Sequence, residues 1–164
     1  MKNSVLLLFV CFALFANSQT ITGVKKQLTF LAGSKTTSSL KLNSGEELIV
    51  RFKQFSVDVV LLSKDQGINL LSFPEDESFK VLKACEFDFD KDGINEIFIV
   101  KGDNLSSLEA VVFKKINNEY KNIGEMNGQF ECILSPFKIE LPYGSQGLFF
   151  EYKLVKGSFI EINN

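Results

Sequence analysis

The chain of 164 residues contains no histidine and only three cysteines. Without histidine there is no base for a serine or cysteine triad, and the sequence also lacks a G-x-S-x-G elbow, a C-x-x-C pair and a phosphate-binding glycine loop. The lack of histidine, together with the lack of a close cysteine pair, argues against zinc and copper sites. We therefore expect a protein that is not an enzyme.

A strong charge of one sign is also missing. Lysine and arginine number 18 against 20 aspartates and glutamates, which gives a net charge of −2. Nucleic-acid-binding proteins carry a basic footprint, so this balance excludes nucleic acid as an expected partner. The lysine pairs Lys25-Lys26 and Lys114-Lys115 are isolated, and we expect both pairs on the solvated surface.

Only one long apolar run is present, and it lies at the start of the chain. Lys2 precedes the run Val5–Phe15, which falls short of the roughly 20 residues that a membrane-spanning helix needs. The pattern is typical of a signal peptide over residues 1–18, cleaved after Ser18. It predicts a periplasmic or secreted protein in which residues 19–164 form a single β-rich domain with no membrane span.

Cleavage would leave two cysteines, Cys85 and Cys132. An oxidising compartment permits a disulfide between them. Both nevertheless lie on the apolar phase of strand-like runs, where buried free cysteines are common. The sequence leaves both states open, because it does not give the Cα separation that a disulfide requires.

Alternation of apolar and polar residues is the main structural signal from Glu47 onward. It predicts strands with one buried side at 47–53 and at 79–89. The residues expected to share a face are Leu48, Val50 and Phe52 in the first strand, and Phe79, Val81, Cys85, Phe87 and Phe89 in the second. Upstream, we expect an edge strand within 27–32 and a loop through 33–39.

The second half reads as short strands separated by turn residues. The predicted strands are 96–102, 108–116, 119–126, 129–135, 137–141, 148–155 and 158–163. The predicted turns include Asn117-Asn118, Asn127-Gly128, Pro142–Ser145 and Lys156-Gly157, with Asn-Gly as a strong hairpin signal. No segment has a convincing helical pattern. The expected fold is all-β: an antiparallel meander, propeller-blade-like or a sandwich.

The segment 88–96, DFDKDGINE, places four carboxylates in nine positions beside the apolar run IFIV. Asp88, Asp90 and Asp92 alternate, and Gly93 then allows the backbone to turn sharply. Carboxylates that converge in this way repel one another unless a cation is present. Calcium is the natural candidate, because it takes about 6–8 oxygen ligands in irregular geometry.

The loop matches an EF-hand only in part, since Ile99 stands at the twelfth position, where an EF-hand has glutamate. It resembles instead the D-x-D-x-D-G-x-x-D/E loop of FG-GAP and VCBS type calcium-binding repeats, found in integrin-like β-propellers and many secreted bacterial proteins. The Phe-Gly and Gly-Ala-Pro signatures are absent, and the chain has one good copy. The resemblance implies no catalytic activity. It implies metal ligation by the side chains of Asp88, Asp90, Asp92 and Glu96 and by the carbonyl of Ile94.

The expected function is that of an exported, non-catalytic calcium-binding β domain, a binding or structural module with an unknown protein or glycan partner. An alternative follows from a second resemblance of loop and architecture, to calcium-binding, propeller-like periplasmic lysozyme inhibitors. It implies an enzyme inhibitor or immunity protein that inserts a protruding loop into an active site, with Gly102–Ser107 or Pro142–Gly147 as the loop. A further alternative is an acidic turn that binds no ion.

Overall fold

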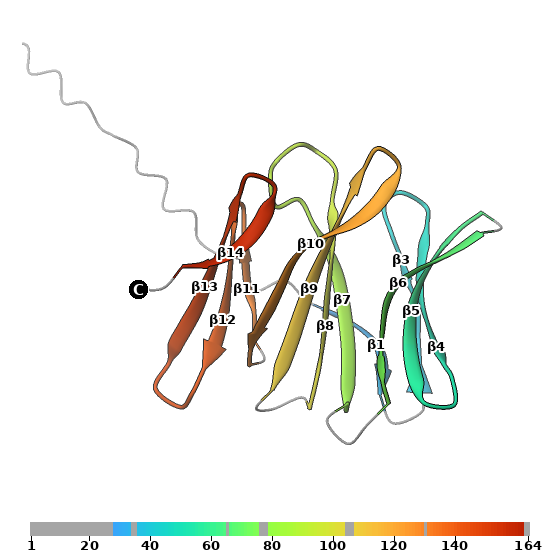
Figure 1. The fold of residues 1–164 in the computed structure, drawn as a ribbon, viewed down its shortest axis with the longest axis horizontal. Helices are drawn as coiled ribbons and strands as arrows, with labels where there is room; N and C mark the ends of the chain where they lie inside the picture. Colours follow the sequence, from blue (N-terminus) through green and yellow to red (C-terminus); the bar gives the residue numbers. More distant parts are fainter. Residues whose placement is uncertain are drawn as a thin grey trace, which may run out of the picture.

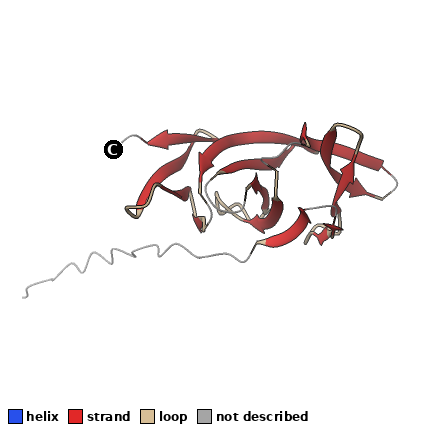
Figure 2. Ribbon diagram, turned by 90° about the horizontal axis from the view of Figure 1, so that it is seen from below, coloured by secondary structure: helices blue, strands red, loops and turns tan. Residues whose placement is uncertain are grey.

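The computed structural model describes residues 28–33, 36–64, 66–75, 79–103, 107–129 and 131–162. These residues form strands and loops and contain no helix (Figure 2). Among them there is accordingly no helix with the length and apolar character needed to cross a membrane. The predicted signal peptide lies outside the described residues.

Within these described ranges, fourteen strands form three antiparallel sheets (Figure 1). The first sheet contains β3 (Leu40–Lys41), β4 (Glu47–Phe52), β5 (Ser56–Ser63) and β6 (Gln66–Pro74). The central sheet contains β7 (Val81–Phe87), β8 (Glu96–Gly102), β9 (Leu108–Ile116) and β10 (Glu119–Gly128), with β1 (Thr29–Gly33) and β2 (Thr36–Thr37) added beside β7. The third sheet contains β11 (Ile133–Ser135), β12 (Lys138–Tyr143), β13 (Leu148–Val155) and β14 (Ser158–Ile162).

The first and third sheets each consist of four consecutive strands paired in chain order, and the central sheet contains four such strands, β7 to β10, with β1 and β2 added at the β7 edge. This confirms the predicted all-β antiparallel meander, and none of the sheets closes into a barrel. Four-stranded meanders of this kind are also the unit of a propeller blade. Here they form a stack of three layers, with the central sheet between the other two (Figure 1).

The strand β8 shows how the central sheet supplies both cores. Phe98 and Val100 pack into the core shared with the third sheet, whereas Ile97 and Ile99 pack into the core shared with the first sheet. All four side chains are at most 1% exposed. Because successive residues point to opposite faces, a strand in a middle layer is apolar throughout and does not alternate.

The same position in the stack corrects the prediction that the strand at 79–89 has only one buried side. Leu82 and Ala84 are fully buried on the face of β7 opposite to Cys85. Phe79 also packs against the first-sheet core, whereas Phe89 belongs to the third-sheet core. Alternation alone does not distinguish a strand that meets solvent on one face from a strand that other sheets cover on both faces.

The turn predictions have mixed outcomes. Asn117 and Asn118 have φ values of 52° and 65° and connect β9 to β10, as predicted. Asn127 and Gly128 were wrongly predicted as a turn, since both are paired with β9 at the end of β10. A Cβ on Gly128 would lie 2.5 Å from the Cβ of Leu141, so this glycine permits close packing of two sheets.

Several strand boundaries also differ from the predictions. The loop expected over 33–39 contains β2, which pairs with β1, and only the end of the run 129–135 is a strand. The two strands β5 and β6 were not singled out from the sequence, although they form half of the first sheet. The strand β2 has only two residues, and so short a strand depends on its pairing partner, which local patterns do not show.

Both described cysteines lie in the third-sheet core, and no disulfide joins them. Burial raises the pKa of the Cys132 thiol to about 12. A thiol with that pKa stays protonated at neutral pH, where thiolate is the reactive form. Cys132 is therefore an unreactive core residue, and Cys85 is buried in the same core.

Candidate metal centre

The acidic loop connects β7 to β8 and is anchored in the core by Phe89. This side chain is fully buried, and its ring lies 5.2 Å from the ring of Phe159. The Phe89 carbonyl accepts a hydrogen bond of 2.7 Å from the backbone N–H of Phe137, in the turn between β11 and β12. Because Phe89 stands between Asp88 and Asp90, its anchoring fixes the backbone of both acids.

Positive φ angles turn the loop back toward β8. Lys91 has a φ of 60° and Gly93 a φ of 87°, and a Cβ on Gly93 would meet no atom within 4 Å. Glycine is therefore favoured there by backbone conformation and not by lack of space. The Gly93 N–H donates to Asp88 Oδ2 at 3.1 Å, and the Ile94 N–H donates to Asp92 Oδ1 at 2.8 Å.

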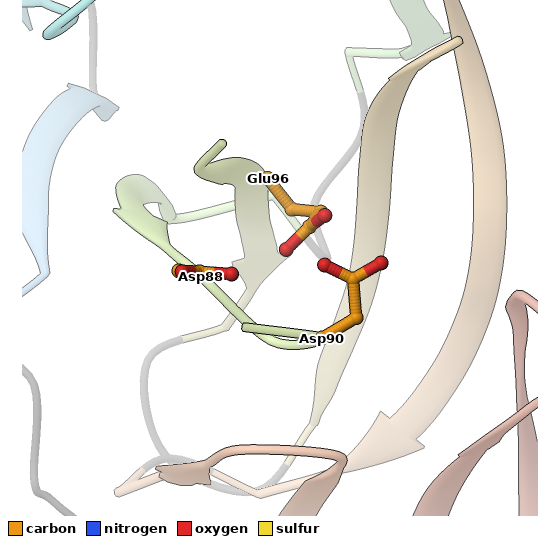
Figure 3. A group of neighbouring side chains, drawn as sticks. All are labelled: Asp88, Asp90 and Glu96. Atoms are coloured by element: carbon orange, nitrogen blue, oxygen red, sulfur yellow. The ribbon is translucent and has the colours of Figure 1, made fainter. Parts of the chain in front are cut away.

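The loop brings three of the predicted ligands together. One carboxylate oxygen from each of Asp88, Asp90 and Glu96 lies within 4.8 Å of the other two. The three side chains gather on one side of the loop (Figure 3). Glu96 begins β8, is only 1% exposed, and its Oε2 accepts a 2.8 Å hydrogen bond from the N–H of Phe89.

A lysine also enters this carboxylate group. The ammonium of Lys114 donates to Asp90, to Asp92 Oδ2 at 2.7 Å and to Glu96 Oε1 at 2.9 Å. Its side chain is 15% exposed. The prediction that Lys114 lies on the solvated surface is therefore wrong, because three carboxylates draw its ammonium into the loop.

The alternating pattern of β9 contains a signal that Lys114 is partly buried. Lys114 continues the face of β9 on which Ala110 and Val112 are buried in the third-sheet core. A lysine on the apolar phase of a strand is unusual unless it finds a buried partner. That partner is Glu96. In the antiparallel pair of β8 and β9, Ile97 lies opposite Phe113, and the next residues along the two strands are Glu96 and Lys114.

The environment of this cluster shifts the pKa values of its members. Burial raises the pKa of Glu96, because its ionised form is desolvated. Burial also opposes the charge of Lys114, but hydrogen bonds to Asp90, Asp92 and Glu96 outweigh it and raise the pKa of this lysine. The hydrogen bond from Lys114 lowers the pKa of Asp92. The ammonium and the Asp92 carboxylate are thus charged at neutral pH.

One lysine does not satisfy all the carboxylate oxygens. An ammonium has three N–H donors, and those of Lys114 serve Asp90, Asp92 and Glu96. Among the described residues, no hydrogen-bond partner reaches Asp88 Oδ1 or Asp90 Oδ1, although both atoms are buried. Buried polar atoms without partners are rare and point to a water or an ion.

No family model, curated protein or solved structure matches this chain. The resemblance to FG-GAP and VCBS loops therefore remains a prediction drawn from the loop residues. The interpretation of the site depends on the donor atoms and contacts described above.

A second polar cluster lies between the first sheet and the central sheet, next to the acidic loop. Glu46, which precedes β4, is buried and accepts hydrogen bonds from Tyr120 Oη at 2.5 Å, Ser44 Oγ at 2.9 Å and Lys115 Nζ at 3.2 Å. Lys114 and Lys115, adjacent on β9, thus serve different carboxylates on opposite faces of the central sheet. Local sequence patterns do not predict this cluster, because its members come from three separate segments.

The Glu46 cluster makes a pH-dependent contribution to stability. Burial opposes ionisation of Glu46, but hydrogen bonds from Tyr120, Ser44 and Lys115 outweigh it and lower its pKa. A lowered carboxyl pKa stabilises the fold above the unfolded pKa, and this stability is lost as the pH falls through the folded pKa.

Replacing Tyr120 with phenylalanine should raise the folded pKa of Glu46 toward its usual value. We expect Tyr120→Phe to lower the free energy of unfolding at pH 7 by about 1.5 kcal/mol, the low end for a hydrogen bond to a charged group. The difference from wild type should shrink as the pH falls below 4.5. Urea unfolding from pH 3 to 7 measures this. Tyr143→Phe is the control, and a difference that is equal at every pH would contradict the assignment.

Two loops are predicted as the segment that an inhibitor would insert, Gly102–Ser107 and Pro142–Gly147. The loop Gly102–Ser107 lies partly outside the described residues. In Pro142–Gly147, the first two residues belong to β12, and the Tyr143 ring stacks on Phe150 at a centroid distance of 4.1 Å. Ser145 and Gln146 are exposed at the turn.

Proposed function

We propose that this chain is an exported, non-catalytic calcium-binding β domain that serves as a binding or structural module for a protein or glycan partner. One observation carries the calcium proposal. Asp88 and Asp90 each keep a buried carboxylate oxygen without a partner among the described residues, beside the buried carboxylate of Glu96. A cation would satisfy these oxygens and relieve the repulsion that the lysine leaves.

The donor set favours calcium over other metals. All donors are oxygens, which suits calcium and magnesium, whereas zinc and copper prefer histidine or cysteine. Calcium–oxygen distances of about 2.3–2.6 Å place opposite ligands about 5 Å apart, so carboxylate oxygens that lie within 4.8 Å of one another can all reach one calcium ion. Asp88, Asp90 and Glu96 would hold the ion, with Asp92 and the Ile94 carbonyl completing the proposed set.

The position of the loop supports a structural role for the ion. The loop contacts the third sheet through the hydrogen bond from Phe137 to Phe89. The end of β7 contacts the first sheet, where the Asn43 N–H donates to Glu86 Oε2 at 2.8 Å. An ion bound between these contacts would stabilise the loop at the junction of all three layers.

A calcium titration of the mature protein tests this proposal. Calorimetry should show one saturable site, with a dissociation constant near the roughly 10⁻⁴–10⁻³ M of extracellular modules. At a concentration about 50 times the dissociation constant, calcium should add about 2 kcal/mol to the free energy of unfolding. Melting curves in calcium and in chelator should therefore differ by several degrees.

Asp90→Ala and Asp92→Ala should each abolish most of the heat and the calcium-dependent shift. Glu119→Gln is the matched control, since it removes an exposed carboxylate at the first residue of β10, next to the turn from β9. It should bind calcium like the wild type. Absence of binding to the wild type at 10 mM calcium would refute the proposal and leave an acidic turn neutralised in part by Lys114.

A further inference from the structure

We infer that Lys114 is a tethered counter-cation that competes with calcium for the acidic loop and thereby makes the site select ions of charge two or more. The inference rests on the proposed calcium site and adds the residue that sets its affinity and selectivity. Its basis is the overlap of donors: Asp90 and Glu96 belong both to the proposed ligand set and to the contacts of Lys114.

The overlap makes simultaneous binding unfavourable. The Lys114 ammonium lies between Asp90, Asp92 and Glu96, with N–O distances of 2.7 and 2.9 Å to the last two. A calcium ion held by the same carboxylates would lie close to this ammonium, and the two cations would repel each other. Calcium binding therefore requires the ammonium to withdraw from at least some of these oxygens.

The placement of Lys114 makes withdrawal feasible without a change in the sheet. Its backbone is fixed in β9, where Lys121 on β10 is its cross-strand partner. The ammonium reaches the loop only through a flexible four-carbon stem, and the side chain keeps 15% of its surface exposed. Rotation about the stem can move the ammonium toward solvent while the ligand residues stay in place.

Competition by a lysine produces charge selectivity. A monovalent ion such as Na⁺ that displaces the ammonium exchanges one positive charge for another and gains little electrostatic energy. A divalent ion places one more positive charge than the ammonium opposite the four carboxylates of Asp88, Asp90, Asp92 and Glu96. It would also contact the Asp88 oxygen that Lys114 does not contact. The lysine should thus exclude abundant monovalent ions from the loop and lower the affinity for calcium.

The test compares Lys114→Met with the wild type by calcium calorimetry at constant ionic strength. Methionine keeps an unbranched apolar stem and removes the charge. We expect Lys114→Met to bind calcium at least tenfold more tightly than the wild type, and to melt at a lower temperature than the wild type in chelator. Its affinity should also fall when potassium is replaced by sodium, which should not affect the wild type.

Two variants control this test. Lys121→Met removes an exposed lysine from the neighbouring strand and should change calcium affinity by less than about threefold, because exposed charges are screened. Lys114→Arg keeps the charge and should bind no more tightly than the wild type. If Lys114→Met is unfolded in chelator, the calcium concentration at which it refolds replaces the calorimetric constant.

The outcomes separate this inference from the calcium proposal. Equal affinity in the wild type and Lys114→Met would overturn the competition and leave the calcium site intact. Binding by Lys114→Met alone would support the competition and overturn calcium binding by the native chain. Absence of binding by both proteins at 10 mM calcium would overturn both.

Discussion

Replacing Phe89 with alanine is expected to lower the free energy of unfolding by about 3–5 kcal/mol, the usual cost of removing a large buried aromatic side chain. Phe89 is fully buried, and its ring packs edge-on against Phe98 at 6.2 Å and Phe159 at 5.2 Å. These contacts join the acidic loop to the core between the central and third sheets. Urea unfolding in chelator measures the loss without a contribution from calcium.

Phe89→Ala should also weaken calcium binding, although Phe89 offers no side-chain ligand. The cavity would release the backbone between Asp88 and Asp90, so the two carboxylates would have to be ordered when the ion binds. Phe149→Ala is the matched control, because the Phe149 side chain is 40% exposed, and it should cost less than about 1 kcal/mol. A loss below about 1 kcal/mol in Phe89→Ala would contradict the anchoring role.

Replacing Glu96 with alanine is expected to have the second large effect, about 3–5 kcal/mol, as found when one partner of a buried ion pair is removed. The variant would leave Lys114 without one of its carboxylates and the N–H of Phe89 without its 2.8 Å acceptor. Glu109→Ala is the control. It removes a glutamate that is 56% exposed and paired with Lys101, and such surface pairs contribute about 0–1 kcal/mol.

Glu96→Gln separates the charge of this residue from its hydrogen bonding. Glutamine can still accept the hydrogen bond from the N–H of Phe89, and because it is uncharged it avoids the desolvation cost that raises the pKa of Glu96. We therefore expect Glu96→Gln to be clearly more stable than Glu96→Ala in chelator, yet to lose most of the stabilisation by calcium. Equal stability of the two variants in chelator would show that the hydrogen bond to Phe89 is not the main contribution.

The acidic loop shows how far local sequence predicts a site. The spacing of Asp88, Asp90, Asp92 and Glu96 around Gly93 indicated converging carboxylates, and the structure brings the side chains of Asp88, Asp90 and Glu96 together. These residues are close in the chain, so a short turn decides their arrangement.

Lys114 shows where local sequence fails. It is 18 residues from Glu96, and only the pairing of β8 with β9 brings it to the loop. Glu46 and Tyr120 are 74 residues apart and meet only because the first sheet packs on the central sheet. A polar pattern on one segment shows neither contact, since each partner belongs to a different strand.

Local patterns are enough to predict the all-β class, most strands after residue 95 and the turns at Asn117-Asn118 and Lys156-Gly157. Alternation and turn preference are properties of neighbouring residues, so they can be read locally. The packing of the three sheets, in contrast, buries the central sheet on both faces, brings Leu141 against Gly128 and places Lys114 in the acidic loop. Each of these features depends on which strands become neighbours. The burial of apolar faces between sheets determines those neighbours, and local patterns do not show it.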